Sequence, residues 1–164
     1  MQGLVSKDED KSCNDTFLKE IVDFDIIGLL ETHTVEGLND NIGFEGYTTF
    51  NYHRPKHSKA THGSGGISVL LNRNIASGIT LKALTNKDYV WLKLNKDFFN
   101  LQNDIHLCIA YIPPSESTYS KRLEINLLDQ IETDIFSYKK TGDVILMGDL
   151  NARVGNCKDF IIRP

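Results

Sequence analysis

The chain has 164 residues, of which 40% are hydrophobic and 24% charged, as in an ordinary folded domain. This composition excludes collagen-like, low-complexity and disordered chains. With 18 Lys and Arg against 22 Asp and Glu, the net charge is −4, so no global positive field attracts a polyanion and any nucleic-acid contact has to be local. No repeat or linker is visible, and we treat residues 1–164 as a single domain.

Cysteine spacing and hydropathy indicate in which cellular compartment the protein is expected. The first ten residues are polar and the longest apolar runs are strand-sized, so we expect neither a signal peptide nor a membrane span. Cys13, Cys108 and Cys157 show no paired spacing, which indicates neither a disulfide framework nor a zinc site. We therefore expect an intracellular protein without a membrane partner.

The first predicted elements are a helix and a strand. Apolar residues at helical spacing follow an approximate capping box, S-x-x-D at 12–15, and predict a helix over 14–23. The next run, DIIGLLE, lacks alternation, which predicts a strand over 26–30 that is buried on both faces. This strand leads directly into a carboxylate, Glu31.

The middle of the chain predicts short strands. Aromatic and β-branched residues predict a strand over 47–52, and apolar segments bounded by turn residues predict others over 67–71, 79–84 and 90–94. Because no helix separates the last three segments, we expect antiparallel pairing among them.

The last third alternates between strand and helix. IHLCIAY predicts a buried strand over 105–111 that ends just before two prolines. Apolar residues at helical spacing from Leu123 to Tyr138 predict the longest helix. It leads into VILMGD, a strand over 144–147 that we expect to be buried and that ends at Asp149.

Two acidic residues at strand ends are candidate metal ligands. Open α/β sheets place their sites at such strand ends, so Glu31 and Asp149 would converge if their strands are neighbours. Carboxylates held close together repel unless a cation neutralises them, and their hard oxygens suit Mg²⁺ or Mn²⁺. The alternative is that each carboxylate simply begins a turn.

Asn151 and Tyr111 could complete such a site. If the backbone is extended, the side chains of Asp149 and Asn151 share one face, where a carboxylate and an amide would suit phosphoryl chemistry. An Asx-turn at Asp149 is the alternative. The hydroxyl of Tyr111, at the end of its strand, would lie near the same rim, unless the ring only packs against neighbouring side chains.

The loop that begins HRPKHSK carries the only concentrated positive charge in the sequence. We expect it to be exposed, with Arg54, Lys56 and Lys59 as candidate contacts to a nucleic-acid backbone. A solvated loop without a binding role is the alternative.

Four segments in order, DIIGLLETH, GSGGISVLL, AYIPP and VILMGDLNARVG, resemble the endonuclease/exonuclease/phosphatase family. The resemblance is closest to the endonuclease domain of non-LTR (LINE-type) retrotransposons. It implies an α/β four-layer sandwich, in which two mixed β-sheets pack face to face with helices outside. It also implies DNA as substrate, and hence a nuclear location.

The resemblance assigns a role to each candidate residue. It implies that Glu31 ligates the divalent ion and that Tyr111 contacts the scissile phosphate. Asp149 would orient or activate the attacking water, and Asn151 would hold a phosphate oxygen. The reaction implied is metal-assisted hydrolysis of a phosphodiester, with Mg²⁺ or Mn²⁺ as cofactor.

The resemblance is incomplete at both ends of the sequence. Family members carry a strand ending in Asn before the segment that matches Gln2 to Leu4, and a further Asp and an Asp-His pair after the last matched segment. We therefore expect a partial domain with weak or no activity, because a positioned acid or base supplies roughly 10²–10⁴-fold in rate. The alternatives are a phosphatase or phosphodiesterase acting on a lipid or small phosphoester, and a non-catalytic fragment.

Overall fold

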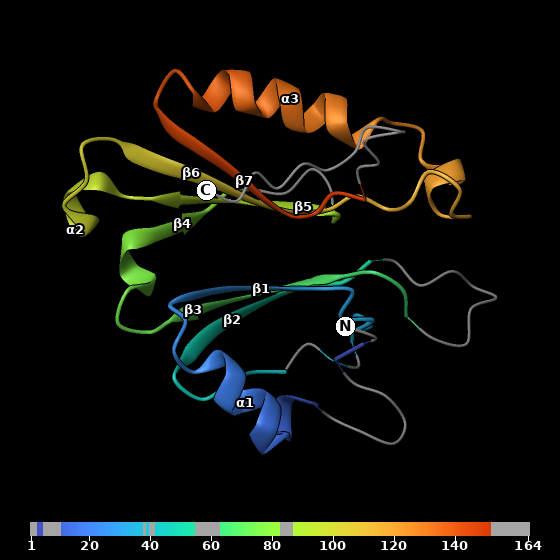
Figure 1. The fold of residues 1–164 in the computed structure, drawn as a ribbon, viewed down its shortest axis with the longest axis horizontal. Coiled ribbons are helices and arrows are strands. Elements are labelled where there is room, and N and C mark those ends of the chain that lie inside the picture. Colours follow the sequence, from blue (N-terminus) through green and yellow to red (C-terminus); the bar gives the residue numbers. More distant parts are fainter. Residues whose placement is uncertain are drawn as a thin grey trace, which may run out of the picture.

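A computed structural model describes residues 3–4, 11–37, 39, 42–54, 63–82 and 87–151. Two β-sheets pack face to face, with α1 against the outer face of one and α3 against the outer face of the other (Figure 1). The elements are η1 (Lys11–Cys13), α1 (Asp15–Ile21), β1 (Ile26–Leu30), β2 (Tyr47–Tyr52), β3 (Ile67–Asn72), η2 (Ala76–Gly78), β4 (Ile79–Leu81), β5 (Tyr89–Leu94), α2 (Lys96–Phe99), β6 (Asp104–Tyr111), η3 (Ser120–Arg122), α3 (Leu127–Tyr138) and β7 (Gly142–Asp149). The predicted two-sheet sandwich is confirmed.

The two sheets differ in strand direction. The first has the order β1-β3-β2 and is antiparallel throughout, whereas the second, β4-β5-β6-β7, is mixed because β6 and β7 run parallel. Within the described residues, the prediction of two mixed sheets therefore holds only for the second. The predicted antiparallel pairing is correct between β4 and β5. It is wrong between β3 and β4, because the chain passes at η2 from the first sheet into the second, and β3 pairs with β1 and β2 instead.

The main core fills the space between the sheets. It is built from alternate aliphatic side chains of β3, β5 and β6, namely Ile67, Val69, Leu71, Val90, Leu92, Leu107 and Ile109. In β1, Gly28 faces this layer, and a Cβ atom added there would lie 2.6 Å from Cγ2 of Ile109. The missing side chain thus lets β1 lie close to β6, which brings the end of β1 near the end of β6.

Helix α1 covers the outer face of the first sheet. Its N-cap is Asn14, whose side chain accepts hydrogen bonds from the amides of Thr16 and Phe17, so the predicted capping box does not form. The hydroxyl of Tyr47 donates to the carbonyl of Ile21 at 2.8 Å and ties the end of α1 to β2.

Helix α3 covers the outer face of the second sheet. Leu127 and Ile131 pack against Trp91 and Cys108, and the indole N–H of Trp91 donates to Asp134 at 2.9 Å. The helix starts later than the predicted Leu123 because the side chain of its N-cap, Asn126, accepts from an amide of the first turn. In the described part of the chain, no helix has the length and apolar character needed to cross a bilayer.

Strand β7 is more exposed than predicted. Ile145 is 47% exposed and Met147 50% exposed, whereas Val144 and Leu146 pack toward α3. The prediction of a buried strand is wrong because β7 lies at the edge of its sheet, with β6 as its only strand partner among the described residues. An apolar run indicates a strand, but it does not show where the strand lies in the sheet.

Candidate active site

Three strand ends from both sheets meet at one side of the sandwich. Glu31 follows β1, Tyr111 ends β6, and Asp149, the partner of Tyr111 in the parallel register, ends β7. The Tyr111 hydroxyl donates to Oε1 of Glu31, with 2.5 Å between the oxygens. The prediction that Glu31 and Asp149 converge as ends of neighbouring strands is not met, because β1 and β7 belong to different sheets. The side chain of Tyr111, next to β7 in the second sheet, instead reaches Glu31 across the sandwich.

Tyr111 is held as a neutral hydrogen-bond donor. The side chain is 7% exposed, and burial is the main cause that raises the pKa of its hydroxyl. The hydrogen bond to Glu31 and the negative charges of Glu31 and Asp149 raise this pKa further, against an opposing effect of Arg54. The hydroxyl therefore keeps its proton at neutral pH, and it lies within the electrostatic reach of both carboxylates.

The backbone is strained at two of the candidate residues. Glu31 has φ +54° and Asn151 has φ +44°, a left-handed conformation that is uncommon for residues other than glycine. The carbonyl of Glu31 accepts from the amide of Gly3, and the amide of Thr32 donates to the carbonyl of Gly66. Such strain persists only where the surrounding structure holds it, and it gathers at functional sites.

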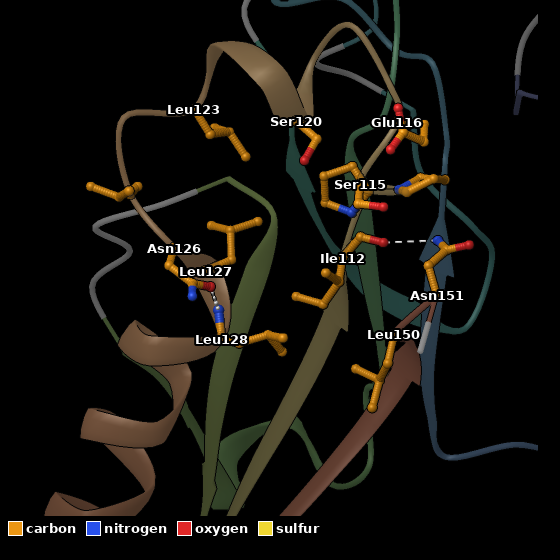
Figure 2. A pocket seen from close by; sticks show the side chains of 13 residues that line it. Ile112, Ser115, Glu116, Ser120, Leu123, Asn126, Leu127, Leu128, Leu150 and Asn151 are labelled. Atoms are coloured by element: carbon orange, nitrogen blue, oxygen red, sulfur yellow. Dashed lines mark hydrogen bonds between the residues drawn. The ribbon is translucent and has the colours of Figure 1, made fainter. Parts of the chain in front are cut away.

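Asp149 and Asn151 are arranged by a turn. The amide of Asn151 donates to Oδ1 of Asp149 at 3.1 Å, which is an Asx-turn, so the extended arrangement considered above does not form. The Asn151 side-chain amide donates to the carbonyl of Ile112 at 2.8 Å, as Figure 2 shows. Asn151 is therefore fixed beside the residue that follows Tyr111.

Gly148 lets β7 approach β6 at this end. It has φ +135°, and a Cβ atom there would lie 1.9 Å from the carbonyl oxygen of Ala110. Only glycine fits such a conformation at such a distance. The glycine before Asp149 thus sets the carboxylate beside the end of β6, a role that its place in the run VILMGD does not predict.

A cavity of about 550 Å³ opens next to Asn151. Its walls are mostly apolar, with Ile112, Leu150, Leu127 and Leu128 around it (Figure 2). Hydroxyl and carboxylate groups of the segment between β6 and α3 also line it, from Ser115, Glu116 and Ser120. A concave apolar space with a few polar groups beside a candidate catalytic residue suits a small organic group.

Only Arg54 of the three predicted nucleic-acid contacts lies within the described residues, and its surroundings differ from the prediction. Arg54 is only 5% exposed and forms an ion pair with Asp88, so the prediction of exposure is wrong for this residue. Lys56 and Lys59 lie outside the described residues, and nucleic-acid binding by this loop stays a prediction.

Sequence reasoning also missed Asp88 and Tyr119, whose hydroxyl donates to the Asp88 carboxylate at 2.7 Å. The position of Asp88 directly before an apolar strand was a signal, because a carboxylate buried there needs a cation.

The donor set at the strand ends fits a hard divalent ion. Among the described residues, no group of three or more His, Cys, Asp and Glu side chains is placed to hold a metal. Mg²⁺ is nevertheless usually held by one or two carboxylates together with water and phosphate oxygens. Glu31 and Asp149 are two carboxylates at this side of the sandwich, which is the number of protein ligands that such an ion usually takes.

Comparison with known proteins agrees with the arrangement of the sheets. The model of the Endonuclease/Exonuclease/phosphatase family matches residues 2–156. No curated protein sequence matches the chain at a significant level.

Two solved structures share the fold. The AP endonuclease LMAP from Leishmania major has a TM-score of 0.56 and 17% identity, and the match covers 83% of this chain and 48% of that one. The human Nocturnin catalytic domain with bound sulfate has a TM-score of 0.53 and 15% identity, with 87% and 57% covered. The chain therefore spans about half the length of these structures.

Proposed function

Because the chain belongs to the endonuclease/exonuclease/phosphatase family, we propose that its site hydrolyses phosphodiester bonds with a divalent metal ion as cofactor. One observation carries the proposal: the Tyr111 hydroxyl contacts Glu31 across the two sheets while Asp149 pairs with Tyr111 in the neighbouring strand. Two carboxylates and a neutral hydroxyl from three separate strand ends can hold a metal ion, orient a water and donate to a phosphate oxygen, which are roles that phosphoryl transfer uses.

Each side chain has a distinct role in the proposed reaction. Glu31 and Asp149 would hold Mg²⁺ or Mn²⁺, which when bound supplies positive charge to the phosphate. The single O–H of Tyr111, kept protonated by its raised pKa, would donate to a non-bridging phosphate oxygen in place of Glu31 once Glu31 ligates the ion. Asp149 orients the attacking water and accepts its proton, and the Asn151 amide contacts a phosphate oxygen.

We propose DNA as the substrate and a retroelement as the origin of the chain. Both rest on the four ordered segments that resemble LINE-type endonucleases, and the AP endonuclease among the structural neighbours supports DNA. In that role the protein acts in the nucleus. Lys56 and Lys59, with their positive charge, are proposed to contact the DNA backbone.

A small phosphoester is the second candidate substrate. The cavity beside Asn151 favours it, because an apolar space of about 550 Å³ is within the range of small-molecule sites. A phosphoester bound there would place its organic group among Ile112, Leu127 and Leu150, next to the proposed phosphate contact.

The test is hydrolysis of supercoiled plasmid, with a small aryl phosphodiester in a parallel assay. We expect nicking with Mg²⁺ that EDTA abolishes, and a loss of roughly 10²-fold or more in Asp149→Ala. Asp143→Ala is the matched control, because Asp143 is an exposed carboxylate at the opposite end of the same strand.

Equal nicking by the wild type and Asp149→Ala would refute the site. Cleavage of the aryl diester alone would favour the second substrate class. If a folded protein cleaves neither substrate and calorimetry detects no Mg²⁺ binding, the chain is a non-catalytic fragment.

A further inference from the structure

Behind Tyr111 lies a buried ion pair that the proposed chemistry does not use. Nε of Arg54 donates to Oδ1 of Asp88 at 2.9 Å, and a second N–H of the guanidinium donates to the same oxygen. The other oxygen of Asp88 accepts from the hydroxyl of Tyr119 at 2.7 Å. Both charged side chains are almost fully buried.

The guanidinium of Arg54 lies against two aromatic rings. Its central carbon is 3.7 Å from the ring centroid of Tyr119 and 5.6 Å from that of Tyr111. A cation over a ring face is attracted to the ring, and more strongly where water is excluded. A glycine makes room for it, since a Cβ atom at Gly65 would lie 2.3 Å from the guanidinium carbon.

This unit contacts the backbone of Tyr111 as well as its ring. The Tyr111 amide donates to the carbonyl of Asp88 at 2.8 Å. Asp88 therefore holds the backbone of Tyr111, Arg54 lies against its ring, and Glu31 accepts from its hydroxyl. These three contacts come from segments far apart in the sequence, and together they fix both ends of one side chain.

Stability alone is a weak reason for such an arrangement. Burying two charges costs desolvation energy that their attraction often fails to exceed, and a well-packed apolar pair of similar volume is commonly as stable. A planar guanidinium that binds a carboxylate in a fixed orientation does, however, set the position of whatever packs on its face. Here the ring stacked on the guanidinium is that of Tyr119, at 3.7 Å, and the ring of Tyr111, whose hydroxyl reaches the candidate metal ligand, lies next to it at 5.6 Å.

We propose that Arg54, held by Asp88 and Tyr119, is a positioning residue that sets the orientation of Tyr111 in which its hydroxyl meets Glu31. The orientation itself is independent of the proposed function, whereas its effect on rate rests on that function. Among the described residues, the contacts of Arg54 are with Asp88, Tyr119 and Tyr111 and not with the candidate metal ligands, so we place its effect on the site through Tyr111.

The first experiment is tyrosine NMR on the full chain, with the Tyr111 signals assigned through their loss in Tyr111→Phe. In the wild type we expect a slowly exchanging hydroxyl proton on Tyr111, because its hydrogen bond is short and buried. Arg54→Met should abolish or shift this proton and move the ring signals. Arg54→Lys should restore them in part, since it returns the charge without the planar fork.

A matched control separates positioning from stability. Lys93→Met breaks a different ion pair, which joins β5 to β6 through Asp104 at 2.7 Å, and should leave the Tyr111 signals unchanged. The proposal is overturned if Arg54→Met lowers the melting temperature while the hydroxyl and ring signals of Tyr111 keep their wild-type positions. Should Arg54→Met not fold, Tyr119→Phe removes only the hydroxyl bonded to Asp88, and unshifted Tyr111 signals in that variant would be equally decisive.

The second experiment follows activity. We expect Arg54→Met to lower kcat by roughly tenfold with little change in KM, because the lost hydroxyl orientation matters in the transition state. In a Tyr111→Phe background the same substitution should have almost no further effect, since residues that act as a unit are not additive. Additive losses would contradict action through Tyr111. If no variant, wild type included, cleaves a phosphodiester, the proposed function fails while the NMR result still decides the positioning.

Discussion

The two ends of β6 both carry a buried polar side chain, but these side chains have different surroundings. At one end, Tyr111 meets a carboxylate of the other sheet and pairs with Asp149 in the next strand. At the other end, His106 stacks on the ring of Tyr138, with 4.6 Å between centroids and 10° between planes. Nε2 of His106 lies 3.0 Å from Oγ1 of Thr141.

This difference teaches which signal identifies a candidate active site. Both groups have shifted pKa values with burial as the largest cause, upward for Tyr111 and downward for His106. A shifted pKa therefore does not distinguish them. The Tyr111 end gathers carboxylates from both sheets on a strained backbone, whereas the ring stack and the hydrogen bond of His106 both come from the short stretch that leads into β7.

The largest expected effect is a difference in kcat between two variants, each of which loses one tyrosine hydroxyl at one end of β6. Tyr111→Phe should lower kcat for phosphodiester hydrolysis by roughly 10²-fold, the cost typical of one lost donor to transition-state charge. Tyr138→Phe, at the His106 end, should leave kcat unchanged. Steady-state kinetics on both variants checks this, and equal effects would remove the functional distinction between the two ends.

A smaller effect is expected from the close approach of β7 to the Tyr111 end. Gly148→Ala should lower the free energy of unfolding by about 2–4 kcal/mol, because the new methyl group meets the carbonyl of Ala110 in a left-handed conformation. Gly37→Ala also has a positive φ but meets no atom within 4 Å, and should cost only about 1 kcal/mol. Urea unfolding measures both, and similar losses would mean that β7 does not lie this close to β6.

The smallest effect concerns pH at the His106 end. Burial, together with Lys82 and Lys93, lowers the pKa of His106 below its usual 6.5, so the unfolded chain binds the proton more readily. The contribution of this histidine to stability is therefore complete above pH 6.5 and declines as the pH falls below it.

Urea unfolding at about pH 5.5 and about pH 7.5 tests this dependence. The His106→Gln variant should lose part of the difference in stability that the wild type shows between the two conditions. A His106→Gln variant with the full wild-type pH dependence would show that His106 does not titrate as described.

Much of the fold could be predicted from the sequence because apolar periodicity depends on local spacing. The strand over 26–30 has the predicted bounds, and the carboxylate after it, Glu31, does lie at a sheet end. The place of a strand in its sheet cannot be predicted in this way. The apolar sequence of β7 predicts a buried strand, but β7 lies at the edge of its sheet. Its exposure depends on strand order, which no local pattern contains.

The site was predictable only in part, for the same reason. Strand ends point to Glu31, Tyr111 and Asp149, but the burial of Arg54 depends on Asp88, 34 positions away in the sequence. A cluster of basic residues usually indicates an exposed loop, and only a partner brought near by folding makes a buried arginine possible.

Gly28 influences the candidate active site through the distance between the two sheets. The gap between Glu31 and the strand ends of the other sheet depends on how near β1 lies to β6, and Gly28 allows that nearness by leaving room for Ile109. A methyl group at this position would act as a wedge and move the first carboxylate outward. Mg²⁺ requires shorter ligand distances than Ca²⁺, so at the proposed metal site this interior residue would influence which of the two ions binds.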